Sequence, residues 1–202
     1  MSAQPTSSNS YDKSRFSEEE YLANERGASY KSEYLNGEVV AMAGASDAHN
    51  LIVANLIIAL GVQLCDRDCS VRASDMCLQV TAAGLYTYPD VSVVCGPPQF
   101  RPDAELDTLL NPCLLVEVLS KSTSKNDRGS KFLFYRSIPS LLYYLIVEPK
   151  VAEVSVYSRH DDGTWLFRAY EGLHSIVPLP ALGLELPLTE IYRRLELPDS
   201  AL

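Results

Sequence analysis

The sequence predicts an α/β fold with a mixed β-sheet flanked by helices and a C-terminal β meander. Three observations predict it. The inferred element order along the chain is helix, hairpin, helix, strands, helix and strand. An apolar run at 113–119 is followed by a helical segment and a second apolar run at 141–147, the spacing of a right-handed parallel crossover. Alternating runs at 151–157 and 164–170 flank the turn residues Asp161-Asp162-Gly163.

Each N-terminal element has a local signal. Ser17 and Glu20 have the capping-box spacing and predict a short helix to about Asn24. Asn36-Gly37 between strand-like flanks at 31–43 predicts a β-hairpin. Ser46 or Asp47 could cap a long helix running to about Cys65. Its apolar residues at helical spacing include Leu51, Ala54, Ile58 and Val62.

The remaining strands and helices are predicted from apolar runs and from the turn-forming or helix-ending residues between them. Strands are expected at 70–80, 89–95 and 113–119, with a loop at 96–112. A polar stretch at 120–130 leads into a helix that ends before Pro139. A short helix from about Leu188 follows the meander.

The chain length suits one domain, assigned to residues 16–197, after a disordered N-terminal tail at 1–15. The longest apolar run, 51–64, is interpreted as a buried helix, so no membrane association is expected. No signal-peptide pattern opens the chain, and the five cysteines are odd in number without a CxxC pair. We therefore expect a cytoplasmic protein with reduced cysteines.

The formal net charge of −9 argues against broad nucleic-acid binding, because Lys and Arg supply phosphate contacts. A nuclease with this charge needs a metal ion and a local basic strip. The basic residues after the apolar run at 113–119 are Lys121, Lys125, Arg128, Lys131 and Arg136. A solvated helix and loop face explains any one of them equally well.

Two carboxylates interrupt runs that otherwise have the pattern of buried strands. Asp90 lies in the run at 88–95 and Glu117 in the run at 113–119. Buried acids need an ionic partner or a cation, so two acids on neighbouring strands suggest a shared divalent metal. The alternatives are a strand-start acid after Pro89 and an internal ion pair of Glu117.

Lys131 could add a positive charge where negative charge develops in a phosphoryl-transfer transition state. It shares a helical face with Asp127, Phe134, Tyr135 and Ile138, which is expected to look towards the sheet. An ordinary Asp127–Lys131 surface pair is the competing interpretation.

Several motifs together resemble those of the Uma-type restriction endonuclease family, which belongs to the PD-(D/E)xK nuclease superfamily. The similarity extends from about Phe16 to Leu195. The matching segments are Pro89-Asp90, 115–120, Ser122-Thr123, 127–129, Lys131 and 143–149.

The resemblance implies a restriction-endonuclease-like core and Mg²⁺-dependent (or Mn²⁺-dependent) phosphodiester cleavage, with Asp90 and Glu117 as metal ligands. Leu119 stands where the superfamily pattern places lysine. The resemblance points instead to Lys131 on the following helix, with Lys121 as a second choice.

Two auxiliary residues follow from the same resemblance. Glu33 matches the first acid of the family and would be a third carboxylate or an orienting group, the alternative being an exposed strand acid. His49 matches a histidine at the start of the long helix and would contact phosphate or relay a proton. A capping or packing role is its alternative.

These observations favour a metal-dependent DNA endonuclease acting as a homodimer, with the aromatic residues of the meander at the interface. The first alternative is a catalytically inactive nucleic-acid-binding or protein-interaction domain with the nuclease fold, favoured by Leu119 and the net charge. The second is a metal phosphoesterase acting on small nucleotides.

Overall fold

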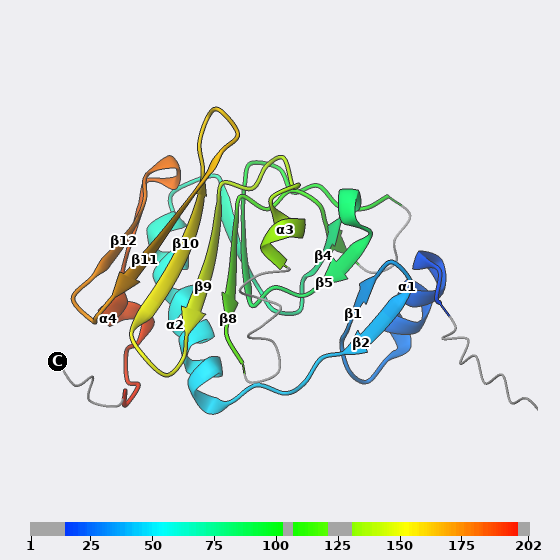
Figure 1. Cartoon of the computed structure of the whole chain (residues 1–202), viewed down its shortest axis with the longest axis horizontal. Coiled ribbons are helices and arrows are strands. Elements are labelled where there is room, and N and C mark those ends of the chain that lie inside the picture. Colours follow the sequence, from blue (N-terminus) through cyan, green and yellow to red (C-terminus); the bar gives the residue numbers. More distant parts are fainter. Residues whose placement is uncertain (1–14, 103–106, 121–130, 198–202) are drawn as a thin grey trace, which may run out of the picture.

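The computed structural model describes residues 15–102, 107–120 and 131–197, which form a mixed α/β fold (Figure 1). A six-stranded mixed sheet has the order β11-β10-β9-β8-β6-β3, a five-stranded sheet has the order β2-β1-β5-β4-β7, and β12 pairs with β13. The bounds of the six-stranded sheet are β3 Cys69–Ala73, β6 Val91–Cys95, β8 Leu114–Val118, β9 Tyr143–Glu148, β10 Glu153–Arg159 and β11 Trp165–Glu171.

The other strands are β1 Ser32–Leu35, β2 Glu38–Ala41, β4 Cys77–Val80, β5 Leu85–Thr87, β7 Thr108–Leu109, β12 Ile176–Leu179 and β13 Leu184–Pro187. The α-helices are α1 Glu18–Gly27, α2 Asp47–Leu64, α3 Lys131–Tyr135 and α4 Leu188–Ile191. Two 3₁₀ turns, η1 Thr81–Ala83 and η3 Pro180–Leu182, complete the described elements.

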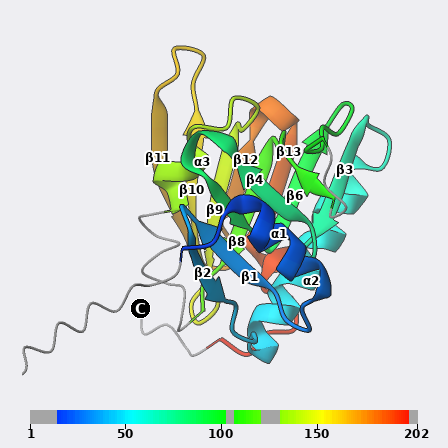
Figure 2. The same ribbon diagram turned by 90° about the vertical axis from the view of Figure 1, so that its right-hand side faces the viewer.

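The N-terminal elements form where their local signals place them. Both bonds of the capping box are present, since the Glu20 amide donates to Ser17 Oγ and the Ser17 amide donates to Glu20 Oε2. The helix extends to Gly27, slightly beyond the predicted end. Asn36 and Gly37 join β1 to β2 with φ of 47° and 97°, the left-handed conformation that a two-residue hairpin turn needs. Figure 2 shows this end of the molecule facing the viewer.

The central sheet contains the predicted crossover. β8 and β9 run parallel, with Leu114 opposite Tyr143, and α3 lies between them in the chain. The sheet is covered by α2 on one face and by α3 on the other (Figure 1). Alternation along β8 sends Val116 and Val118 into the core cluster of α2, and Leu115 into that of α3.

The apolar residues named for α2 from helical spacing do not form its buried face. Its buried apolar residues are Ile52, Leu56, Leu60 and Leu64, whereas Ile58 and Val62 are 61% and 68% exposed. The helix carries apolar residues all round, so helical periodicity alone could not select the face. By length and composition α2 could also cross a membrane, but here its buried face packs against the sheet.

The single strand expected at 70–80 is two strands in different sheets. β3 pairs with β6, β4 pairs with β5 and β7, and a turn closed by the Met76 amide and the Ala73 carbonyl separates them. β5 and β7 were not predicted, and neither was the β12–β13 hairpin. These strands are short, and β5 and β7 depend in addition on distant partners, β1 and β4 respectively.

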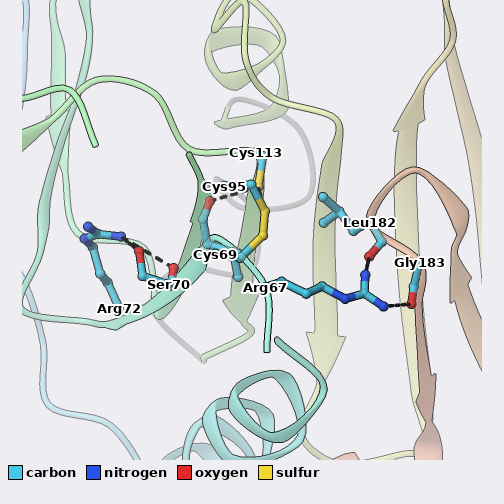
Figure 3. The surroundings of a disulfide bond; sticks show 9 residues. Arg67, Cys69, Ser70, Arg72, Cys95, Cys113, Leu182 and Gly183 are labelled. Carbon is cyan, nitrogen blue, oxygen red and sulfur yellow. Dashed lines mark hydrogen bonds between the residues drawn. A yellow bond between two sulfur atoms is a disulfide. The ribbon is translucent and has the colours of Figure 1, made fainter. Parts of the chain in front are cut away.

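The expectation of reduced cysteines is also wrong for one pair. Cys69 and Cys95 are opposite each other on antiparallel β3 and β6 and form a disulfide (Figure 3). Cys65, Cys77 and Cys113 are free thiols. An odd number of cysteines without a CxxC motif does not predict which cysteines form a disulfide. Only the register of β3 against β6 brings Cys69 and Cys95 together.

Candidate active site

Asp90 immediately precedes β6 and is fixed by two contacts. Its Oδ2 atom accepts a hydrogen bond of 2.7 Å from the Val118 amide and lies 3.1 Å from His49 Nε2. The Asp90 side chain is 14% exposed. Because Val118 follows Glu117 on the neighbouring strand, this contact ties the Asp90 carboxylate to the chain segment that carries the second acid.

His49 lies in the first turn of α2, whose N-cap is Ser46. Its side chain is 10% exposed, and its Nδ1 atom is buried without a hydrogen-bond partner among the described residues. Nε2, which contacts Asp90, is therefore the one ring nitrogen of His49 that has a partner among the described residues. The placement supports a role in orienting Asp90, whereas the cap of α2 is Ser46 and not the His49 side chain, against the capping role predicted as an alternative.

Glu117 extends from β8 towards α3, and its side chain is 5% exposed. Its Oε1 atom accepts hydrogen bonds from Lys131 Nζ at 3.0 Å and from the Tyr135 hydroxyl at 2.7 Å. Lys131 and Tyr135 are four residues apart on α3, so both project from the same helical face. Burial, followed by the negative charge of Glu117, raises the pKa of Tyr135 well above its ordinary value. The hydroxyl therefore remains a donor at any ordinary pH.

Lys131 joins Glu117 to a third carboxylate. Its Nζ atom lies 3.0 Å from Glu33 Oε1 as well as 3.0 Å from Glu117 Oε1, and its side chain is 7% exposed. Thr87 on β5 donates a 2.5 Å hydrogen bond to Glu33. A surface role for Lys131 is therefore wrong, and Glu33 is not an exposed strand acid, being 23% exposed.

These residues surround one cavity of about 450 Å³. It lies between the β1–β2 hairpin, the start of α2 and the end of β8. Of the predicted site residues, Glu33, His49, Asp90, Glu117 and Lys131 line it. Lys121 lies outside the described residues, as do Lys125, Asp127 and Arg128, whereas Arg136 is exposed.

Three further contacts were not predicted from the sequence. Tyr135 and Thr87 hold Glu117 and Glu33, and Lys31 lines the cavity while donating to the Ser74 carbonyl at 2.8 Å. The spacing of Tyr135 four residues after Lys131 was a usable signal. Thr87 lay in a strand that was not predicted, and a single lysine beside a hairpin is not distinctive.

The donor chemistry of the site fits a hard divalent cation. Carboxylate oxygens such as those of Asp90 and Glu117 are the ligands that Mg²⁺ and Mn²⁺ prefer. Asp90 Oδ1 accepts no hydrogen bond from a described residue. Within the described ranges, no three His, Cys, Asp or Glu side chains converge as a ready-made metal cluster. The Lys131 ammonium already lies between two of the carboxylates.

A family model matches most of the chain. Residues 18–189 match the model of the Uma2 family, described as "Putative restriction endonuclease". Two Synechocystis proteins, both uncharacterized, are 38% identical. One, slr1290, matches over 90% of this chain and 93% of its own length, and the other, sll1609, over 76% and 86%.

A solved structure supports the fold. A crystal structure of "a putative nuclease belonging to DUF820" from Anabaena variabilis superposes with a TM-score of 0.70. The match covers 86% of this chain and 96% of that chain, at 18% sequence identity. At this identity the likeness establishes the shared mixed α/β architecture.

Proposed function

Because the chain belongs to the Uma2 family, we propose that it is a metal-dependent endonuclease that hydrolyses phosphodiester bonds in DNA. One observation carries the proposal. A single cavity is lined by the carboxylates of Asp90 and Glu117, from neighbouring strands of the central sheet, and by the buried ammonium of Lys131. Two acids and a lysine around a cavity large enough for a phosphate suit phosphodiester hydrolysis.

Asp90 and Glu117 would hold the metal ion, which is Mg²⁺ or Mn²⁺. When bound, such an ion supplies Lewis acidity and lowers the pKa of a coordinated water. The Val118 amide and His49 hold Asp90 in place, so this ligand needs little reorganisation. Tyr135 holds Glu117 through a hydrogen bond to one oxygen. Hydrogen-bonded supports of this kind orient metal ligands.

Lys131 would stabilise the charge that develops on the phosphate oxygens. Its ammonium is buried, and a positive charge in a poorly hydrated site acts more strongly on a developing anion than one in water. Glu33 would orient the lysine from the opposite side, with Thr87 fixing Glu33 in turn. The lysine on α3 thus takes the place of the one that the superfamily pattern puts at position 119.

DNA must approach a protein with a net charge of −9. Lys31 supplies a positive charge at the cavity, where its side chain is 36% exposed and its Nζ atom also contacts Asp75 at 3.0 Å. Lys121 would contribute a further phosphate contact. Binding through so few lysines implies a shallow dependence of affinity on salt concentration.

We also propose that the protein is a homodimer formed through the β10–β11 meander. Tyr157 and Trp165 pack on Phe132, with ring centroids 4.1 and 5.3 Å from its ring, so they contribute little free surface. Phe167 on β11 is 52% exposed and would form the apolar contact, whereas Leu166 points to the opposite face of the sheet. A monomer at micromolar concentration in light scattering would contradict this assembly.

A catalytically inactive nucleic-acid-binding or protein-interaction domain is the second candidate. Leu119 favours it, because the residue at the usual lysine position is 3% exposed and belongs to the core on the α3 side. Such a domain would bind a partner without cleaving DNA.

Incubation of the purified protein with plasmid DNA, and with DNA and RNA oligonucleotides, separates the two candidates. Parallel reactions contain Mg²⁺, Mn²⁺ or EDTA. We expect DNA cleavage with either metal and none with EDTA. Binding without cleavage under every metal condition would favour the inactive domain, and cleavage restricted to RNA would replace DNA as the substrate.

A further inference from the structure

Three sulfur atoms lie together on the central sheet, away from the candidate active site. The disulfide joins Cys69, at the start of β3, to Cys95, at the end of β6. Cys113 immediately precedes β8, and its Sγ atom lies 3.7 Å from Cys95 Sγ (Figure 3). The Cys113 amide donates to the Val93 carbonyl at 2.8 Å, which fixes the thiol beside the bridge. A free thiol is thus held in contact with a disulfide sulfur.

We propose that Cys69, Cys95 and Cys113 form an intramolecular thiol–disulfide exchange site. In the exchange, the bridge moves from Cys69–Cys95 to Cys95–Cys113 and leaves Cys69 as a free thiol that can be modified. The inference does not rest on the proposed nuclease function. It rests on the contact between the Cys113 and Cys95 sulfur atoms.

The step is balanced without an added oxidant or reductant. The Cys113 thiolate forms a bond to Cys95 Sγ while the bond between Cys95 and Cys69 breaks. The electron pair of the broken bond stays on Cys69, whose thiolate takes up the proton that Cys113 lost. The two sulfur atoms at 3.7 Å must close to the disulfide length of about 2.05 Å, a shift within reach of side-chain rotation.

The surroundings give the released thiol space. All three cysteines line a second cavity of about 530 Å³. Arg67 is the one charged side chain among the described residues that line it, and its guanidinium donates to the carbonyls of Leu182 and Gly183.

The exchange would change which strands are cross-linked. The bridge seen here ties β3 to β6, whereas a Cys95–Cys113 bridge would tie β6 to the start of β8. These two strands carry Asp90 and Glu117 at their other ends, because they run antiparallel. After the exchange, the new Cys95–Cys113 bridge would therefore cross-link β6 and β8, the strand pair that presents both candidate metal ligands.

Alkylation of the native, oxidised protein tests the proposal. The protein is incubated with N-ethylmaleimide without reductant, quenched in acid, digested and mapped by mass spectrometry. We expect peptides with alkylated Cys69 together with a Cys95–Cys113 disulfide. Burial raises the pKa of the Cys113 thiol, so the thiolate fraction and the labelling rate should rise about tenfold per pH unit between pH 7 and 9.

Two variants complete the test. Cys113→Ser should abolish labelling of Cys69, and Cys65→Ser, which removes an exposed thiol outside the cluster, should leave it unchanged. An intact Cys69–Cys95 bridge in the wild type at every pH would overturn the proposal. So would Cys69 labelling that persists in Cys113→Ser. The wild-type map decides the question even if that variant does not fold.

Discussion

Lys131 and Glu117 form a buried ion pair, with 3.0 Å between Nζ and Oε1 and side chains that are 7% and 5% exposed. The same ammonium lies 3.0 Å from Glu33, so one positive charge is shared by two carboxylates. A divalent cation bound through Glu117 would share this ligand with the lysine. The pair therefore links protein stability, metal binding and catalysis, and each can be measured separately.

Replacing Lys131 by alanine should separate catalysis from metal binding. We expect cleavage at saturating Mg²⁺ to fall by about 10²-fold or more, because the donor that stabilises transition-state charge is lost. Without metal, the variant should lose about 3 kcal/mol of stability, since buried Glu117 and half-buried Glu33 lose their counter-charge. Added Mg²⁺ should restore part of it. Cleavage assays, metal titration calorimetry and urea denaturation measure these effects.

Lys150→Ala is a control for Lys131, because Lys150 is an exposed residue in the turn after β9. It should change neither activity nor stability. Lys121→Ala should weaken DNA binding and its salt dependence, with little effect on turnover at saturation. Full activity in Lys131→Ala together with its loss in Lys121→Ala would transfer the catalytic role to Lys121.

Replacing Asp90 by alanine should abolish cleavage and weaken Mg²⁺ binding together, because this change removes a metal ligand. The fold should survive, since Asp90 precedes β6 and its side chain is 14% exposed. Circular dichroism, metal titration and plasmid cleavage measure the three properties. Asp161→Ala, in the exposed β10–β11 turn, is the matched control. Unchanged metal affinity in Asp90→Ala would remove Asp90 from the ligand set.

Replacing Tyr135 by phenylalanine removes one hydroxyl and its 2.7 Å hydrogen bond to Glu117. We expect a loss of about 2 kcal/mol in stability, typical of a hydrogen bond to a charged group. The Mg²⁺ concentration for half-maximal cleavage should increase, because Glu117 is less well oriented. Tyr157→Phe removes a hydroxyl from the aromatic cluster around Phe132 and should change neither property. If the Mg²⁺ concentration for half-maximal cleavage is unchanged in Tyr135→Phe, Tyr135 does not orient Glu117 for metal binding and only packs in the core.

Stability should fall at alkaline pH. Burial raises the pKa of the Cys77 thiol from 9.0 to about 12 and that of Tyr135 well above 10.0. The unfolded chain therefore releases these protons at lower pH than the folded protein does. The stabilisation is complete below about pH 9 and is lost as pH rises towards 12. Urea denaturation between pH 8 and 11.5 measures this loss, and Cys77→Ala should reduce its slope. A constant stability over this range would contradict the assignment.

Local chemistry allowed much of the architecture to be predicted. The capping box at Ser17 and Glu20 and the turn at Asn36-Gly37 operate within a few residues, so their outcome does not depend on the rest of the chain. The strands around Asp90 and Glu117 were recognised in the same way. A carboxylate within an apolar run conflicts with its surroundings, and this conflict identified both residues as candidates.

Tertiary structure alone decided the features that depend on distant neighbours. The sequence could not show which face of α2 is buried, or that residues 69–80 divide between two sheets, because those outcomes depend on which strands become neighbours. The Cys69–Cys95 bridge follows from the register of β3 against β6. The sequence identified Lys131 as a candidate. Only the fold places its ammonium between Glu33 and Glu117, two residues that are distant from each other in the chain. Burial of that shared charge is what gives the candidate site its chemistry.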